Sequence, residues 1–340
     1  MEACRINVSG AKEKWRDGLK VVFRVDSSLA IGTGHVMRCL TLAQMLKENG
    51  ADVKFICRKH EGCLIGKIRS SGFIVHELEL FEEAEVDTRL AHSHWLGATY
   101  QKDADDCIDI LKAEKSNWLI VDHYALDEQW QKRLKPYYEK LMVIDDLADR
   151  KHQCDILLDQ TFGRQQEDYL TLTHEYCKLL LGSKYALLRA EFAKWRPYSL
   201  ERRNKSEFKQ LLINMGGVDV DNVTENVLDE LKICNLPNDM NITVVMGGSA
   251  PHLESVKSKA ITLPYKTEVK VDVDNMAEIM ANSDIAIGAA GSTTWERCCL
   301  GLPTIQIITA KNQLFSAETL AHHNIVKLAK EIKEIAYLLE

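Results

Sequence analysis

Residues 21–38 have the sequence VVFRVDSSLAIGTGHVMR, and this stretch decides the fold expected for the first half of the chain. The apolar, β-branched run 21–25 predicts a buried strand, and residues 36–47 carry the apolar spacing of a helix. The loop that joins them contains Gly32 and Gly34, which allow a tight turn and a close approach to a ligand. A strand, a glycine loop and a helix in this order begin a β-α-β unit of a parallel sheet.

The same alternation continues and forms two series. The first contains expected strands at 21–25, 53–57, 73–75, 119–121 and 142–144, with a further helix at 104–111. The second contains expected strands at 211–215, 242–246, 285–287 and 304–308, with helices at 222–231, 276–281 and 294–300. We therefore expect an α/β protein with two doubly wound, Rossmann-like domains that face each other across a cleft.

The length of 340 residues also suits two domains, at about 150 residues per domain. We expect an extension at residues 1–19, an N-terminal domain at 20–195 and a C-terminal domain at 207–340. Residues 196–206 carry a proline and several basic side chains but little apolar periodicity, which indicates an interdomain linker.

Composition excludes several classes of protein. With 46% hydrophobic and 27% charged residues the chain is typical of soluble globular proteins, and a net charge of -7 argues against nucleic acid as a partner. No apolar run approaches the roughly 20 residues that span a bilayer, and the first residues lack the apolar core of a signal peptide. The ten cysteines form no zinc-binding repeat. We expect a cytoplasmic protein with reduced thiols, no metal, no cofactor and no membrane partner.

Ligands of open parallel sheets bind at the carboxyl ends of the strands. In the first domain, the loop after the first strand offers Asp26, Gly32 and Gly34 as substrate contacts. His35 lies at the start of the next helix, where the helix dipole disfavours a charged imidazole and leaves the ring available as a proton acceptor. A histidine that only caps its helix is an equally good interpretation of this position alone.

Other polar residues follow neighbouring strands of the same domain. The sequence Asp122-His123-Tyr124 comes after the strand 119–121, and Asp145-Asp146 comes after the strand 142–144. Both sets of residues should project from the same edge of the sheet, toward the cleft. For Asp145 and Asp146, after the strand 142–144, a role in a turn or helix cap is the favoured interpretation. We expect residues 92–94, with two histidines, to form a solvated loop rather than a metal site.

Three loops of small residues stand out in the second domain. They supply the candidate phosphate contacts Gly216, Gly217, Gly247, Gly248, Gly291, Ser292 and Thr293. Backbone amides of such loops bind phosphates, so together they predict a site for a nucleoside diphosphate. The chain has no G-x-x-x-x-G-K-[ST] motif, which argues against an ATPase.

Glu296 has two interpretations. In the first, residues 293–296 form a T-x-x-E capping box, in which the carboxylate binds the start of its own helix. In the second, the carboxylate accepts two hydrogen bonds from a ribose diol beside the phosphate loop. One side chain cannot easily do both.

An ordered set of motifs resembles a known family. The motifs are RVDSS (24–28), GTGHVMR (32–38), VDHY (121–124), CDILL (154–158), YALLRAEF (185–192), MGGVD (215–219) and KNQ (311–313). They resemble, in this order, the UDP-2,4-diacetamido-2,4,6-trideoxy-β-L-altropyranose hydrolases of pseudaminic acid biosynthesis. The two domains and their glycine loops look like the GT-B fold of MurG-type glycosyltransferases. The resemblance covers roughly residues 20–325.

The resemblance implies an enzyme that hydrolyses a UDP-sugar at its anomeric carbon with inversion, using water and no essential metal. The catalytic histidine of the family corresponds to His35, and its active-site tyrosine and asparagine correspond to Tyr124 and Asn312. Two alternatives remain open. A MurG-like glycosyltransferase would deliver the sugar to an acceptor hydroxyl, although residues 64–72 are only a short amphipathic stretch for a lipid acceptor. A UDP-sugar-binding protein without catalysis is the other.

Overall fold

The computed structural model describes residues 18–81, 89–205 and 207–339. The chain divides into two compact units, Met1–Leu187 and Leu188–Glu340. Most of the expected extension at residues 1–19 lies outside the described residues, which begin at Gly18.

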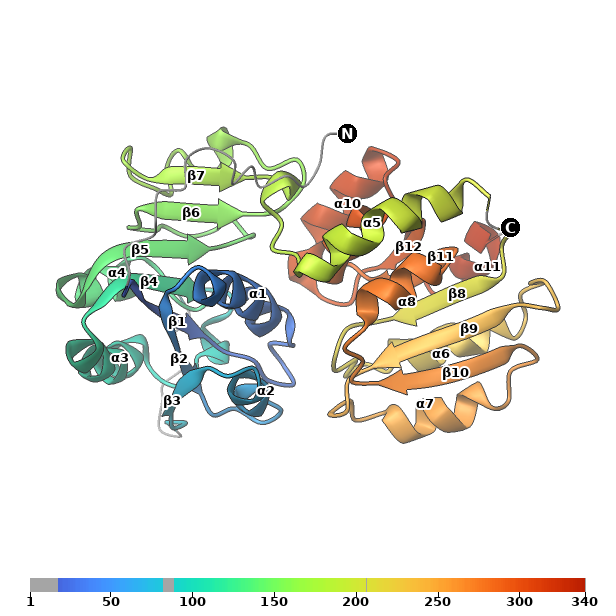
Figure 1. The fold of residues 1–340 in the computed structure, drawn as a ribbon, viewed down its shortest axis with the longest axis horizontal. Coiled ribbons are helices and arrows are strands. Elements are labelled where there is room, and N and C mark those ends of the chain that lie inside the picture. Colours follow the sequence, from blue (N-terminus) through green and yellow to red (C-terminus); the bar gives the residue numbers. More distant parts are fainter. Residues whose placement is uncertain (1–17, 82–88, 206, 340) are drawn as a thin grey trace. The chain divides into compact units, whose positions relative to one another are not determined.

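The first unit contains a seven-stranded sheet in the order β3-β2-β1-β4-β5-β6-β7, and every pair of neighbouring strands is parallel (Figure 1). The strands are β1 (Lys20–Val25), β2 (Asp52–Arg58), β3 (Ile74–Leu78), β4 (Ser116–Asp122), β5 (Tyr138–Ile144), β6 (Ile156–Asp159) and β7 (Lys178–Leu181). The five strands expected from the sequence are thus confirmed, and β6 and β7 extend the sheet.

Helices cover both faces of this sheet. They are α1 (Gly34–Glu48), α2 (Ile65–Ser70), α3 (Tyr100–Glu114) and α4 (Glu128–Leu134). Successive residues of a strand point to opposite faces, so Phe23 packs with α1 and α2, whereas Val22 packs with α3 and α4. Since β1 has β2 on one side and β4 on the other, the order of the sheet reverses there. The loops after β1 and β4 separate at this point, and ligands of doubly wound sheets bind at such a place.

The second unit contains a six-stranded parallel sheet in the order β10-β9-β8-β11-β12-β13. The strands are β8 (Gln210–Asn214), β9 (Asn241–Met246), β10 (Lys266–Val271), β11 (Ile285–Ala289), β12 (Thr304–Ile307) and β13 (Lys327–Ala329). The helices are α5 (Ala190–Arg203), α6 (Val223–Leu231), α7 (Leu253–Ala260), α8 (Met276–Asn282), α9 (Thr293–Cys299), α10 (Leu314–His322) and α11 (Glu334–Leu339). None of the helices in the described ranges is long and apolar enough to cross a membrane.

The stretch expected to be a linker, residues 196–206, is mostly helical and belongs to the second unit, because α5 spans Ala190–Arg203. Its contacts are largely polar. Ser199 Oγ donates to the carbonyl of Leu300 at 2.7 Å, and Arg203 donates to the carbonyls of Met280 and Ser283 at 3.0 and 2.6 Å. A helix held in this way shows little apolar periodicity, which explains why the pattern suggested a linker. The units separate at Leu187 and Leu188 instead.

Candidate active site

His35 is the second residue of α1 and pairs with a buried carboxylate. Its Nδ1 lies 2.6 Å from Oδ1 of Asp122, the last residue of β4. An ionised carboxylate only accepts hydrogen bonds, so Nδ1 of the neutral ring carries the proton and Nε2 keeps its lone pair. The N-cap residue of α1 is Thr33, so His35 does not occupy the capping position. The ring is arranged as an acceptor of a proton at Nε2.

Arg38 keeps Asp122 ionised. Its Nε and Nη2 donate to the two oxygens of Asp122 at 2.6 and 2.7 Å, one turn of α1 after His35. Burial by itself would raise the pKa of Asp122, but the charge of Arg38, aided by His35, holds that pKa well below its usual range. A carboxylate that stays ionised can stabilise an imidazolium when His35 takes up a proton.

Tyr124 lies against His35, with the ring centroids 4.6 Å apart in an edge-to-face arrangement. Its hydroxyl donates to Oδ1 of Asp146, whose other oxygen accepts from Nη1 of Arg38 at 2.7 Å. Trp95 stacks on the tyrosine at 5.6 Å. Burial raises the pKa of Tyr124 well above its usual value, so the phenol is neutral.

Three members of this cluster were not among the site residues expected from the sequence: Arg38, Asp122 and Asp146. Asp146 was expected to serve a turn or cap, but it binds Tyr124 and Arg38. A signal for Arg38 was present, since a residue three positions after His35 lies on the same face of a helix. Asp145 does have a turn role, because it accepts from the amide of Ala148 at 3.0 Å.

Asp26 does not fit the expected contact with substrate. Its side chain is fully buried, and it accepts from Nη1 of Arg24 and from the amide of Arg58, both at 2.6 Å. His123 Nε2 lies 3.2 Å from the same carboxylate, and burial lowers the pKa of His123. Both residues therefore belong to an internal polar network.

The loop glycines of the first unit have different roles. Gly32 has a φ of 79°, a left-handed conformation that favours glycine, and it closes the turn by donating to the carbonyl of Ser28 at 2.9 Å. Gly34 begins α1 directly before His35. The turn thus sets where the helix starts and where the histidine lies.

In the second unit, the loops after β8 and β9 pack closely against each other. A Cβ on Gly247 would lie 2.2 Å from the carbonyl oxygen of Gly217, so only glycine fits there. The amide of Gly248 donates to Asp272 at 2.8 Å, and the expected phosphate contact of this amide is therefore not supported. Gly216 follows β8 and has a φ of 96°, a left-handed conformation that favours glycine.

The loop after β11 contains Gly291, Ser292 and Thr293, and α9 follows it. The N-cap of α9 is Ser292, and no side chain caps the helix, so the capping-box interpretation of Glu296 is wrong. Glu296 lies 3.7 Å from Arg189, and burial raises its pKa to about 7. The carboxylate remains available for the ribose interpretation.

Asn312 lies in a short 3-10 helix, Lys311–Gln313, after β12 of the second unit. Its neighbour Gln313 fixes the turn by accepting from the amide of Thr309 at 3.0 Å. The structure thus brings His35 and Tyr124 together in the first unit and places Asn312 in the second.

Residues 92–94 are solvated only in part, because His94 is exposed whereas His92 and Ser93 are half-buried. Ser93–Trp95 form a 3-10 helix. The ring centroid of His92 lies 4.5 Å from that of Trp95 and 5.2 Å from that of Tyr124. Across the ranges that the structure describes, no group of three or more His, Cys, Asp or Glu side chains is arranged to hold a metal ion.

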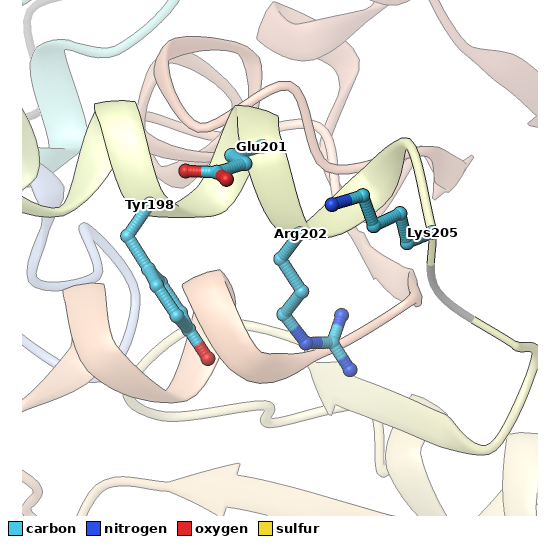
Figure 2. Close-up of a pocket in the computed structure, with 4 residues that line it drawn as sticks. All are labelled: Tyr198, Glu201, Arg202 and Lys205. Atoms are coloured by element: carbon cyan, nitrogen blue, oxygen red, sulfur yellow. The ribbon is translucent and has the colours of Figure 1, made fainter.

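A surface pocket of the second unit lies along α5 and is lined by Tyr198, Glu201, Arg202 and Lys205 (Figure 2). The hydroxyl of Tyr198 donates to Asn282, and Nη1 of Arg202 donates to Asp284, both at 2.7 Å. These contacts attach α5 to its own unit. None of the candidate site residues lines this pocket.

Comparisons with known proteins agree with this architecture. The profile of the Glycosyltransferase family 28 C-terminal domain matches residues 211–339. The solved structure of MurG from Acinetobacter baumannii superposes with a TM-score of 0.65 and 14% identity, and the match covers 94% of this chain and 89% of that one. Such a likeness shows the shared GT-B fold.

Two relatives are similar in sequence. The chain is 28% identical over 291 residues to the uncharacterized protein MJ1062 of Methanocaldococcus jannaschii, covering 84% of this chain and 55% of that protein, so it spans about half the length of that relative. It is 30% identical over 304 residues to the UDP-2,4-diacetamido-2,4,6-trideoxy-beta-L-altropyranose hydrolase of Campylobacter jejuni, covering 89% of this chain and 96% of that enzyme. The chain therefore belongs to the UDP-2,4-diacetamido-2,4,6-trideoxy-beta-L-altropyranose hydrolase family.

Proposed function

We propose that this protein hydrolyses UDP-2,4-diacetamido-2,4,6-trideoxy-β-L-altropyranose at the anomeric carbon with inversion. The products are UDP and 2,4-diacetamido-2,4,6-trideoxy-L-altrose, an intermediate of pseudaminic acid biosynthesis. The observation that carries the proposal is the pairing of His35 with Asp122. Membership of the hydrolase family is the basis for proposing this substrate.

The proposed reaction is a single displacement by water. Nε2 of His35 removes a proton from water as the oxygen forms a bond to the anomeric carbon, and the bond from that carbon to the phosphate oxygen breaks. The leaving UDP takes the electron pair, and the Asp122 carboxylate stabilises the imidazolium. A single displacement inverts the configuration. UDP is a good leaving group and needs little help from an acid.

The remaining candidate residues would bind substrate. Tyr124 and Asn312 are proposed to position the water or the sugar. In the second unit, the amides of Gly291, Ser292 and Thr293 would hold the diphosphate, and Glu296 would bind the ribose. Gly216, Gly217 and Gly247 would shape the adjoining turns.

No disulfide joins the cysteines of the described ranges, and this suits the reducing cytoplasm, where UDP-sugars are made. We therefore propose a cytoplasmic location, with a UDP-sugar and water as the partners of the protein.

Sugar transfer is the second candidate, favoured by the match to the glycosyltransferase domain. Ile65 and Ile68 of α2 are buried, so residues 64–72 offer little apolar surface to a lipid acceptor. The test is incubation with a panel of UDP-diacetamido sugars without any acceptor, followed by detection of UDP and free sugar. Hydrolysis predicts both products. Release of UDP only after an acceptor is added would indicate transfer, and binding without release would indicate a non-catalytic protein.

A further inference from the structure

We propose that Arg38 is a positioning residue that fixes His35 and Tyr124 in one arrangement, by holding their two carboxylate partners on a single guanidinium. This inference rests on the proposed hydrolysis and names the residues that prepare His35 and Tyr124 for it. It also specifies what Tyr124 can bind.

The geometry of Arg38 is the basis of the proposal. Nε and Nη2 bind the two oxygens of Asp122 at 2.6 and 2.7 Å, and Nη1 binds Asp146 at 2.7 Å. Asp122 in turn holds His35, and Asp146 holds Tyr124. A planar guanidinium presents its donors in a fixed fork, so the two carboxylates keep a fixed separation.

If Arg38 served only to compensate the charge of Asp122, its two hydrogen bonds to that carboxylate would be enough. The third bond reaches Asp146, which comes from the loop after β5 and lies 108 positions away along the chain. Arg38 is nearly buried, with only 5% of its side chain exposed. A buried guanidinium shared by two carboxylates, each bound to one site side chain, ties the two side chains together.

This arrangement fixes the polarity of Tyr124. Its only hydrogen points to Asp146, which Arg38 keeps available as an acceptor. The phenol oxygen then has only lone pairs to offer. Tyr124 therefore binds a donor, such as an acetamido N–H, a hydroxyl of the sugar or the attacking water, and does not protonate the leaving group.

Arg38 also places a positive charge beside His35, because Nη2 lies 3.2 Å from Nδ1. Both nitrogens carry hydrogen, so Asp122, and not Arg38, accepts the hydrogen bond from the ring. Among the residues that the structure describes, the charged, titratable or aromatic groups that face His35 are Arg38 on α1, Asp122 and Tyr124 at the end of β4, and His92 and Trp95 before α3. Arg38 is the cation among them that bonds to Asp122.

Two substitutions of Arg38 separate charge from geometry. The variant Arg38→Met removes both, whereas Arg38→Lys keeps the charge but cannot hold both carboxylates in the same way. Arg133→Met is the matched control, because it removes an exposed arginine of α4 whose guanidinium pairs with Asp105, away from the cluster around His35. The full-length protein is used throughout, and each variant is first checked by its melting temperature.

For Arg38→Met we expect kcat to fall about 100-fold, the size of effect that misplaced reacting groups produce. Arg38→Lys should lose about 10-fold in kcat. Activity within about threefold of the wild type in both variants would overturn the proposal.

A double-mutant cycle tests whether Asp146 acts through Tyr124. Tyr124→Phe and Asp146→Asn should each lower kcat/KM by about 10-fold, and the double variant should lose less than the two single effects combined, because the two residues share one hydrogen bond. Any loss beyond that of Tyr124→Phe reflects the bond of Asp146 to Arg38. Effects that add in the double variant would show that Asp146 does not act through Tyr124.

The tautomer of His35 gives a reading that does not require turnover. Nitrogen-15 spectra of the histidine rings should show Nδ1–H for His35 in the wild type and a mixture of tautomers in Arg38→Met. If the wild type hydrolyses no UDP-sugar, the proposed function fails while this measurement still decides on Arg38. An unchanged tautomer in Arg38→Met contradicts the positioning role.

Discussion

A neutral histidine is an effective base only when one ring nitrogen is fixed as a donor, and Asp122 fixes Nδ1 of His35 in this way. Removing the base should therefore affect chemistry and leave nucleotide binding alone. We expect His35→Asn to lower turnover by about two to four orders of magnitude, with UDP affinity nearly unchanged. Turnover is measured by UDP release, and affinity by calorimetry.

His174→Asn is the control for this prediction, because His174 is exposed and lies outside the cluster around His35. If His35→Asn keeps more than about a tenth of the wild-type turnover, the base lies elsewhere. His123, which is buried against Asp26, would be the next histidine to test.

Glu296 provides a prediction about pH. Burial raises its pKa to about 7, and a carboxylate that accepts hydrogen bonds from ribose hydroxyls must be ionised. UDP affinity should therefore rise as the pH increases through about 7. In Glu296→Gln the affinity should be lower and should lose this trend, as measured by calorimetry between about pH 6 and pH 8.

The same raised pKa has an effect on stability with a defined sign. The unfolded state ionises Glu296 before the folded state does, so stability decreases as the pH rises from the usual range of a glutamate through about 7. Glu296→Gln should flatten this slope. UDP affinity that is unchanged in the variant at every pH would contradict the ribose interpretation.

Individual residues also show how much of the candidate site could be predicted from the sequence. The position of His35 after a glycine loop could be recognised, because strand, loop and helix are local patterns. Its partners could not, since Asp122 lies 87 positions away and Asp146 lies 108 positions from Arg38. The pattern shows which residues end a strand, but the contact between two side chains depends on how the whole sheet packs.

At the level of secondary structure, most of the buried strands were predictable, although the short buried strand β6 was not among those expected. The strand β11 is a short apolar run and was expected. The edge strand β10 has the sequence KTEVKV, in which charged residues alternate with others and no residue is fully buried, so no apolar run marks it. The C-terminal part of α5 was not predicted as a helix for a similar reason, because hydrogen bonds of Ser199 and Arg203 attach it to the rest of the second unit.

The helix α5 leads to a prediction about the second unit. Phe192 is fully buried in a core with residues of α8 and with Leu300, and Arg203 satisfies the carbonyl of Met280. A fragment of residues 188–340 should therefore melt cooperatively and bind UDP. A fragment of residues 207–340, which lacks α5, should melt at a clearly lower temperature or fail to fold.

The comparison uses calorimetry for UDP and circular dichroism for melting. Phe192→Ala in the full chain is a point substitution that tests the same packing, with an expected loss of about 3–5 kcal/mol of the free energy of unfolding. Equal melting temperatures for the two fragments would show that α5 does not stabilise the unit. UDP binding by residues 20–187 instead would place the nucleotide in the first unit.

At the level of the whole molecule, the residues proposed for catalysis and for nucleotide binding are distributed over the two units. His35 and Tyr124 belong to the first, whereas Asn312 and the loop with Gly291 belong to the second. UDP binding should depend on the second unit alone, while turnover should require the full chain. The two activities can thus be separated by substitution, and the remaining question is which bond the full chain breaks.

The bond that breaks can be identified with labelled water. If His35 activates water towards the anomeric carbon, hydrolysis in oxygen-18 water places the label on the free sugar, because the bond between carbon and the phosphate oxygen is the one cleaved. Attack on phosphorus would place the label on a phosphate product, and such a reaction usually needs a metal to stabilise the added charge. An imidazole base requires no metal, so excess chelator should leave the rate unchanged. Mass spectrometry of both products makes the assignment, and label in the phosphate product or loss of activity with chelator would contradict the mechanism.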